Sequence, residues 1–157
     1  MRRLLPFLVL LGCGGEDADV AGDFSIAVTN RDNGCEFDNW TEGETSANIP
    51  VTITQSGSDV TATIEGLTGT FVEAVLGSRT YEGGVDGNDI FLELFGSRAA
   101  NQGNCAFTIN SEIDAVISGD VLEGRINYKA ATNGNPDCDT LEGCVSFQDF
   151  NGTRPPQ

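Results

Sequence analysis

From Asp23 onward, apolar residues recur at every second position in short runs, and Gly, Asn, Asp and Ser separate these runs. A period of two is typical of β-strands, whereas a helix that faces a core repeats its apolar residues every three to four positions. The first run sets Phe24, Ile26 and Val28 on one face of a strand. We therefore expect an all-β domain.

Three short turns between neighbouring runs predict β-hairpins. They are Ser56-Gly57-Ser58, Asp86-Gly87-Asn88 and Ser118-Gly119-Asp120. Such residues favour tight turns because Gly adopts positive φ freely and Asn and Asp tolerate it. The strands that these turns join are expected at 51–55 and 60–64, at 81–85 and 89–95, and at 113–117 and 122–128.

The remaining segments are less regular. The polar segment 31–48 is expected to be the longest irregular stretch. Segment 67–77 is ambiguous because 71–76 is nearly all apolar and fits a strand or one short helix, and we predict a strand. A separate strand is expected at 105–109, and a last one at 145–150.

About eight to ten short strands joined mainly by hairpins form a meander, and closing a meander into a barrel leaves no open edge. We predict an up-and-down barrel, and in its strand spacing the chain resembles the small lipocalin-like and avidin-like barrels. A two-sheet β-sandwich is the alternative. Its long crossings between sheets would be segments 31–48, 96–103 and 131–144.

The chain begins with the cationic Met1-Arg2-Arg3, followed by an apolar run from Leu4 to Leu11. This run is far shorter than the roughly 20 residues that span a bilayer, and the combination is typical of a signal peptide. It ends in Leu10-Leu11-Gly12-Cys13, which resembles the lipobox of bacterial lipoproteins. In that family the cysteine thiol receives a diacylglycerol and the peptidase cuts just before it. The resemblance implies removal of residues 1–12 and lipidation of Cys13.

The same resemblance implies a place in the bacterial cell envelope. Because Gly14 is not Asp, it implies anchoring at the outer membrane, on the periplasmic face or the cell surface. Residues 13–22 are then a lipidated, flexible acidic tether, and residues 23–157 form a single β-domain. An ordinary secretory leader with a chance cysteine is the alternative.

Five cysteines are present. If Cys13 carries lipid, an even set remains in an oxidising compartment, which favours two disulfides with open connectivity. A zinc site is disfavoured because the set lacks the paired C-x-x-C spacing. The four disulfide candidates are Cys35, Cys105, Cys138 and Cys144.

The chain of 157 residues has 24 acidic and 8 basic side chains, no His, and a net charge of −16. Nucleic-acid binding is excluded because it needs clustered Lys and Arg. Without His, or a G-x-S-x-G motif, we expect no enzyme, with a carboxylate-based hydrolase as the alternative. We also expect no cofactor, no metal and a monomer. The charge either keeps densely packed copies apart, which we favour, or attracts a cationic partner or divalent ions.

One predicted strand has two apolar faces. Glu93 shares a face with Phe91 and Phe95, and this face either lines the lumen as a candidate ligand pocket or lies outside; we favour the outside. Segments 86–89 and 133–139 place oxygen side chains at alternate positions, as calcium loops do. Neither has the spaced Glu and central Gly of an EF-hand loop, and we favour ordinary turns.

The sequence therefore predicts a lipid-anchored envelope protein whose non-catalytic β-domain binds a small ligand or a partner. A ligand in the barrel mouth requires an interior cavity lined by Phe91 or Phe95. A structural or adhesive surface protein, the alternative, requires a filled core and an exposed apolar patch or ordered acidic loop.

Overall fold

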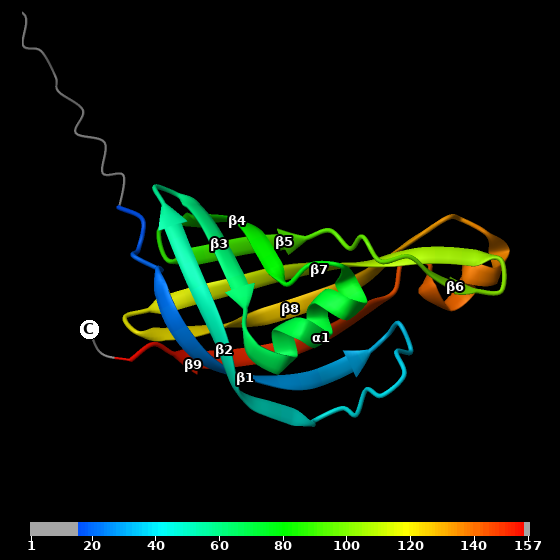
Figure 1. Ribbon diagram of the computed structural model, residues 1–157, viewed down its shortest axis with the longest axis horizontal. Coiled ribbons are helices and arrows are strands. Elements are labelled where there is room, and N and C mark those ends of the chain that lie inside the picture. The colour runs from blue at the N-terminus through cyan, green and yellow to red at the C-terminus, as the bar shows by residue number, and fades with distance from the viewer. Residues whose placement is uncertain (1–15, 156–157) are drawn as a thin grey trace, which may run out of the picture.

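Eight antiparallel strands close into an up-and-down barrel in the computed structural model, which describes residues 16–155 (Figure 1). The predicted signal peptide, 1–12, and Cys13 lie outside these residues. The predicted barrel is confirmed, since β5 pairs with β7 and β9 pairs with β1. The barrel strands are β1 (Gly22–Asn33), β2 (Thr45–Ser56), β3 (Asp59–Ile64), β4 (Thr80–Asp86), β5 (Asp89–Leu94), β7 (Cys105–Ser118), β8 (Val121–Thr132) and β9 (Val145–Thr153).

The core fills the barrel because most of the alternate positions that point inward are aliphatic or aromatic. In β5, for example, Ile90, Leu92 and Leu94 are buried while the residues between them face out. The same alternation runs through β1, β2, β3 and β7. A closed barrel leaves no free strand edge between these eight strands, which removes the usual route to edge-to-edge aggregation.

The barrel has two unlike ends, which lie at opposite sides of Figure 1. The hairpin end holds the three predicted turns, where Gly57 and Gly87 adopt φ of 64° and 61° that a side chain would strain. The stapled end holds helix α1 (Gly66–Leu76), the short strand β6 (Ala100–Gln102), the 3-10 helix η1 (Pro136–Leu141) and both disulfides. The first residue of β1 and the last of β9 both lie at the hairpin end.

The strand predicted at 71–76 is wrong, because this segment belongs to α1. The helix buries Gly69 and Leu76, and it ends at Gly77, whose φ of 93° lets its N–H bond the Glu73 carbonyl. Phe71 faces solvent. Apolar residues therefore lie on both sides of this helix, which hides its period in the sequence.

Two smaller expectations also change. Segments 105–109 and 113–117 belong to one continuous strand, β7. Its first residues extend beyond the barrel and pair with β6. The irregular stretch is shorter than expected, since β1 continues to Asn33 and β2 begins at Thr45.

Both expected disulfides form, at the stapled end. Cys35 follows β1 and bonds Cys144, which precedes β9, so that this bridge fastens the ends of two paired strands. Cys105 begins β7 and bonds Cys138 of η1. Together with Leu141, the four cysteines form a second, small core that is separate from the barrel core.

The last residues of the expected tether, 13–22, are fastened to the hairpin end. The Ala18 N–H donates to the Gly87 carbonyl at 2.7 Å, and the Asp17 carboxylate accepts from the Gly87 N–H at 3.0 Å. Val20 is fully buried, and its N–H donates to the Gln55 side chain at 2.8 Å. The folded domain thus includes residues 17–22 as well as those from 23 onward.

Candidate functional site

The barrel interior is filled. The space left inside is about 40 Å³ and is lined by apolar side chains and Tyr81. Ligand pockets are typically about 300 to 1,000 Å³, so the lumen has no room for a ligand. Among the described residues, the polar or charged side chains that are buried are two serines, Ser111 and Ser146.

A neutral hydrogen-bonded layer closes the interior toward the stapled end. The Tyr81 hydroxyl donates to Ser111 at 3.0 Å, and the Tyr128 hydroxyl donates to Gln148 at 2.8 Å. Gln148 in turn donates to Asn30 at 2.6 Å. Burial raises the pKa of Tyr81 to about 12, although the Ser111 bond lowers it, so the phenol stays protonated at neutral pH. These bonds link β4 to β7, β8 to β9 and β9 to β1.

Phe91, Glu93 and Phe95 lie on the outer side of the barrel. Phe91 is 46% exposed and Phe95 is 71% exposed, while Glu93 is half-buried between neighbouring strands. The lumen alternative for these residues therefore fails, and the outer position that the sequence analysis favoured is the observed one. On this outer side Phe91 lies opposite Asp114 in the register and two residues before Glu93.

We call this side the acidic face: the outer side of β4, β5 and β7 with the adjoining ends of β3 and β8. Antiparallel register sets Glu82 opposite Glu93 and Glu93 opposite Glu112, so three carboxylates lie side by side on adjacent strands. Like charges placed directly opposite each other are destabilising. The carboxylates of the acidic face are Asp59, Glu82, Asp86, Asp89, Glu93, Glu112, Asp114 and Glu123.

These charges are poorly compensated by the rest of the chain. Lys129 donates to Glu112 at 2.6 Å, and the other seven carboxylates have no ion pair within residues 16–155. Asp114 accepts one neutral bond, from Asn127 at 3.4 Å. The acidic face thus keeps a large net negative charge.

An open hollow of about 730 Å³ lies on the acidic face near the hairpin end. Its lining includes Phe91, Gly84, Asp59 and Asp114. In the register, Gly84 lies between Asp59 and Phe91, so that the side of the ring that faces β4 meets no side chain there. The sequence analysis missed Asp59, Gly84 and Asp114 because only the cross-strand register brings them beside Phe91.

The seam between β8, β9 and β1 shows a similar ring and carboxylate with their cation in place. The Arg125 guanidinium lies 4.1 Å from the Phe147 ring centre and donates to Asp149 at 2.9 Å. Arg31 donates to the other oxygen of Asp149, also at 2.9 Å. Partial desolvation raises the pKa of Asp149, but the hydrogen bonds and charges of Arg125 and Arg31 outweigh it and lower the pKa below its ordinary value.

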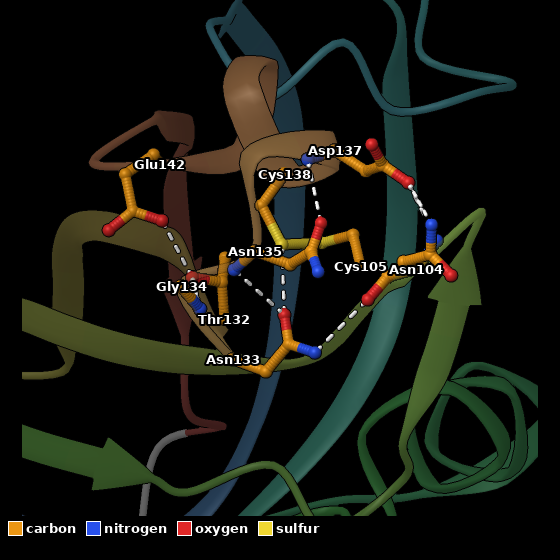
Figure 2. The surroundings of a disulfide bond; sticks show 9 residues. All are labelled: Asn104, Cys105, Thr132, Asn133, Gly134, Asn135, Asp137, Cys138 and Glu142. Carbon is orange, nitrogen blue, oxygen red and sulfur yellow. Dashed lines mark hydrogen bonds between the residues drawn. A yellow bond between two sulfur atoms is a disulfide. The ribbon is translucent and has the colours of Figure 1, made fainter.

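The loop 133–139 is internally bonded, as Figure 2 shows. The Asn135 side chain accepts from the Asp137 N–H at 3.1 Å and so caps η1. Asp137 accepts from the backbone and side chain of Asn104, both at 2.9 Å, beside the Cys105–Cys138 bond. The oxygen-bearing side chains of loop 133–139 form turns and a helix cap, which is the role that the sequence analysis favoured over calcium binding.

Within residues 16–155 no group of three or more Asp, Glu, Cys or His side chains is arranged to hold a metal ion. Neither helix of this part of the chain is long and apolar enough to cross a membrane.

Comparisons with known proteins add little. No family model matches the chain, and no curated protein matches it. A solved structure titled "Structure of EF1p2_mFAP2b bound to DFHBI" is similar at 12% identity and a TM-score of 0.42, covering 86% of this chain and 93% of that one. At this level of likeness we base no argument about function on it.

Proposed function

We propose that this protein is a bacterial cell-envelope lipoprotein, anchored by lipid on Cys13, whose non-catalytic barrel binds a partner on its outer surface. The observation that carries the anchor is the use of the other four cysteines. They pair with one another at the stapled end, as Cys35–Cys144 and Cys105–Cys138. The fifth cysteine, Cys13, follows Leu10-Leu11-Gly12 and remains for the lipid.

The fastening of residues 17–20 gives this anchor a direction. Asp17 follows Cys13 by four positions, and a fully extended chain spans at most about 3.5 Å per position, or about 14 Å. Because Asp17 and Val20 are bonded at the hairpin end, a lipid on Cys13 holds that end close to the bilayer. The stapled end, with its disulfides, then points away from the membrane.

A binding role on the outer surface, without catalysis, is supported by the filled interior. The lumen keeps about 40 Å³, whereas the hollow on the acidic face measures about 730 Å³. Among the described residues no Asp, Glu, Lys or Arg side chain is buried, so the interior offers no acid or base in a water-excluded setting. Outer-membrane placement rests on Gly14 after the cysteine, as the lipoprotein resemblance implies.

Metabolic labelling tests the anchor. Cells that express the full chain are grown with labelled palmitate, beside cells that express Cys13→Ser. We expect label and membrane recovery for the wild type and no label for the variant. Quantifying free thiols controls for folding, because both proteins should keep the two disulfides and expose no thiol. An unlabelled wild type that fractionates as a water-soluble protein contradicts the anchor.

A structural or adhesive surface protein is the second candidate, and helix α1 favours it. Leu67, Phe71 and Val75 are 91%, 69% and 45% exposed, and their spacing puts them on one side of the helix. Exposed apolar patches of this kind mark contact surfaces. Sedimentation of the purified protein tests this role: concentration-dependent association that Phe71→Ser abolishes supports adhesion, and a monomer at all concentrations contradicts it.

A further inference from the structure

We infer that the acidic face is a docking surface for an arginine-rich, cationic polypeptide, with an arginine of the partner stacked on Phe91 beside Asp114. This inference rests on the proposed partner-binding role and names the partner's chemistry. Two observations carry it: the charge complementarity of the face, and a filled version of the same arrangement elsewhere in the molecule.

The negative charge of the acidic face favours a cationic partner. Two cations of the chain lie beside its eight carboxylates: Lys129, which pairs with Glu112, and Arg125, which lies opposite Asp114 but bonds Asp149. A uniform need for solubility would spread such charge evenly, but β1, β2 and β3 carry, apart from Asp59 of the acidic face, several threonines and two carboxylates, Asp23 and Asp32. Charge concentrated on one side raises the encounter rate with an oppositely charged partner.

The seam at β8 and β9 shows the geometry that we expect for the partner's arginine on Phe91. There, Phe147 and Asp149 lie two residues apart on one strand, and Arg125 covers the ring while it pairs with the carboxylate. On the acidic face, Phe91 lies directly opposite Asp114 and two residues before Glu93. Ring and carboxylates are thus neighbours again, at the roughly 5 Å that separates cross-strand pairs.

No arginine of the described chain fills this second position. Arg125 lies opposite Asp114 in the register, but it bonds Asp149 on its other side. Phe91 keeps 46% of its surface exposed, and Gly84 leaves the flank of the ring open toward Asp59. A guanidinium in this hollow gains a ring to stack on and carboxylates to pair with.

Arginine is favoured over lysine because of the shape of this position. A guanidinium is planar, stacks on a ring face and keeps its edge free to donate to carboxylates, whereas an ammonium is a compact and strongly hydrated point charge. An anionic membrane surface is excluded as the occupant, since the face repels it. The partner is therefore a polypeptide with several arginines.

Titration calorimetry with a synthetic octa-arginine peptide tests this inference on the purified full-length protein in a neutral detergent. We expect octa-arginine to bind at least about threefold more tightly than octa-lysine. Phe91→Ala should weaken octa-arginine binding about three- to fivefold, and Asp114→Asn about threefold. Binding should weaken as salt is raised.

Matched control variants separate the inference from diffuse attraction. Phe71→Ala removes another exposed ring, on α1, and Asp23→Asn removes another exposed carboxylate, on β1; both should change binding less than about twofold. All four positions face solvent, and urea unfolding should give similar midpoints. Equal losses at Phe91 and Phe71, or at Asp114 and Asp23, overturn the inference.

Two further measurements also support or overturn the inference. Displacement of octa-arginine by about 1 mM calcium, but not by sodium chloride of equal ionic strength, overturns the inference in favour of a divalent-cation surface. Binding by Cys13→Ser that matches the wild type supports the docking surface independently of the anchor. A failed anchor thus leaves the peptide titration intact, and a failed titration leaves the anchor intact.

Discussion

Two sides of one barrel differ sharply in what they present to solvent. The acidic face carries eight carboxylates and the exposed rings of Phe91 and Phe95. The neutral face, which is the outer side of β1, of β2 and of β3 from Thr61 onward, carries few charged groups and has hydrogen bonds between its own side chains. There, the Thr29 and Thr45 hydroxyls bond each other at 2.8 Å, and Thr52 donates to Asp23 at 2.8 Å.

The seam of Arg31, Arg125 and Asp149 marks the boundary between these two sides. At the seam a ring and a carboxylate are matched by arginines from the chain itself, whereas on the acidic face such groups stay unmatched. The difference teaches that the net charge of −16 is not evenly spread. One side of the barrel has its arginines and carboxylate paired within the chain, and the other keeps seven carboxylates without an ion pair in residues 16–155.

Loss of a disulfide is the largest expected effect on the free energy of unfolding. It also compares the two sides, because one disulfide holds β1 of the neutral face and the other holds β7 of the acidic face. Cys35–Cys144 joins β1 to β9 with a sequence separation of 109, and Cys105–Cys138 holds β7 with a separation of 33. Because loop-closure entropy grows with loop length, Cys35→Ser/Cys144→Ser should lose about 4 to 5 kcal/mol, and Cys105→Ser/Cys138→Ser about 1 kcal/mol less. Urea unfolding measures both. An equal or larger loss for the shorter loop would contradict this account.

The seam gives the next largest effect. Asp149 has a lowered pKa in the folded state, so its ion pairs add stability above the unfolded value of about 3.9, and this stability is lost as the pH falls through the folded pKa. The pair is exposed, with 37% of the Asp149 side chain accessible, so Asp149→Asn should cost at most about 1 kcal/mol at pH near 7.

Unfolding in urea at pH near 7 and near 2.5 checks this prediction. The difference between Asp149→Asn and the wild type should be smaller at the lower pH, because the unfolded-state carboxyl is protonated there. Asp23→Asn is the matched control, because Asp23 has a hydroxyl partner and no ion pair. A difference of the same size at both pH values would show that the seam acts by packing and not by charge.

The smallest effect concerns the carboxylates aligned across the acidic face. Glu93 lies between Glu82 and Glu112, so Glu93→Gln should relieve repulsion and raise the free energy of unfolding by about 0.5 kcal/mol at low salt. The gain should shrink as salt screens the charges. Thermal unfolding at two salt concentrations measures it, and destabilisation by Glu93→Gln would refute the repulsion.

Much of the fold follows from local sequence. Strand alternation and the turns at Gly57, Gly87 and Gly119 predict the hairpins correctly, because these signals are contained within a few residues. Helix α1 is missed because Phe71 and Val75 are apolar yet face solvent, so neither helical nor strand period is visible. The disulfide pairing is also hidden, since it depends on which strand ends meet.

The candidate site is predictable only in part. Alternation puts Phe91, Glu93 and Phe95 on one face, but Ile90, Leu92 and Leu94 are equally apolar, so alternation alone cannot decide which set faces inward. The neighbours of Phe91 come from register between strands that are distant in the chain. That information arises only when the barrel closes.

The most direct test of the central claim is a map of where arginine binds. Two-dimensional NMR of the isotope-labelled protein, titrated with octa-arginine, reports each backbone amide separately. We predict that the signals of Gly84, Phe91 and Asp114 shift progressively while those of Thr52 and Thr54 stay in place. Shifts of similar size on both faces, or larger shifts at the two threonines, would contradict the account.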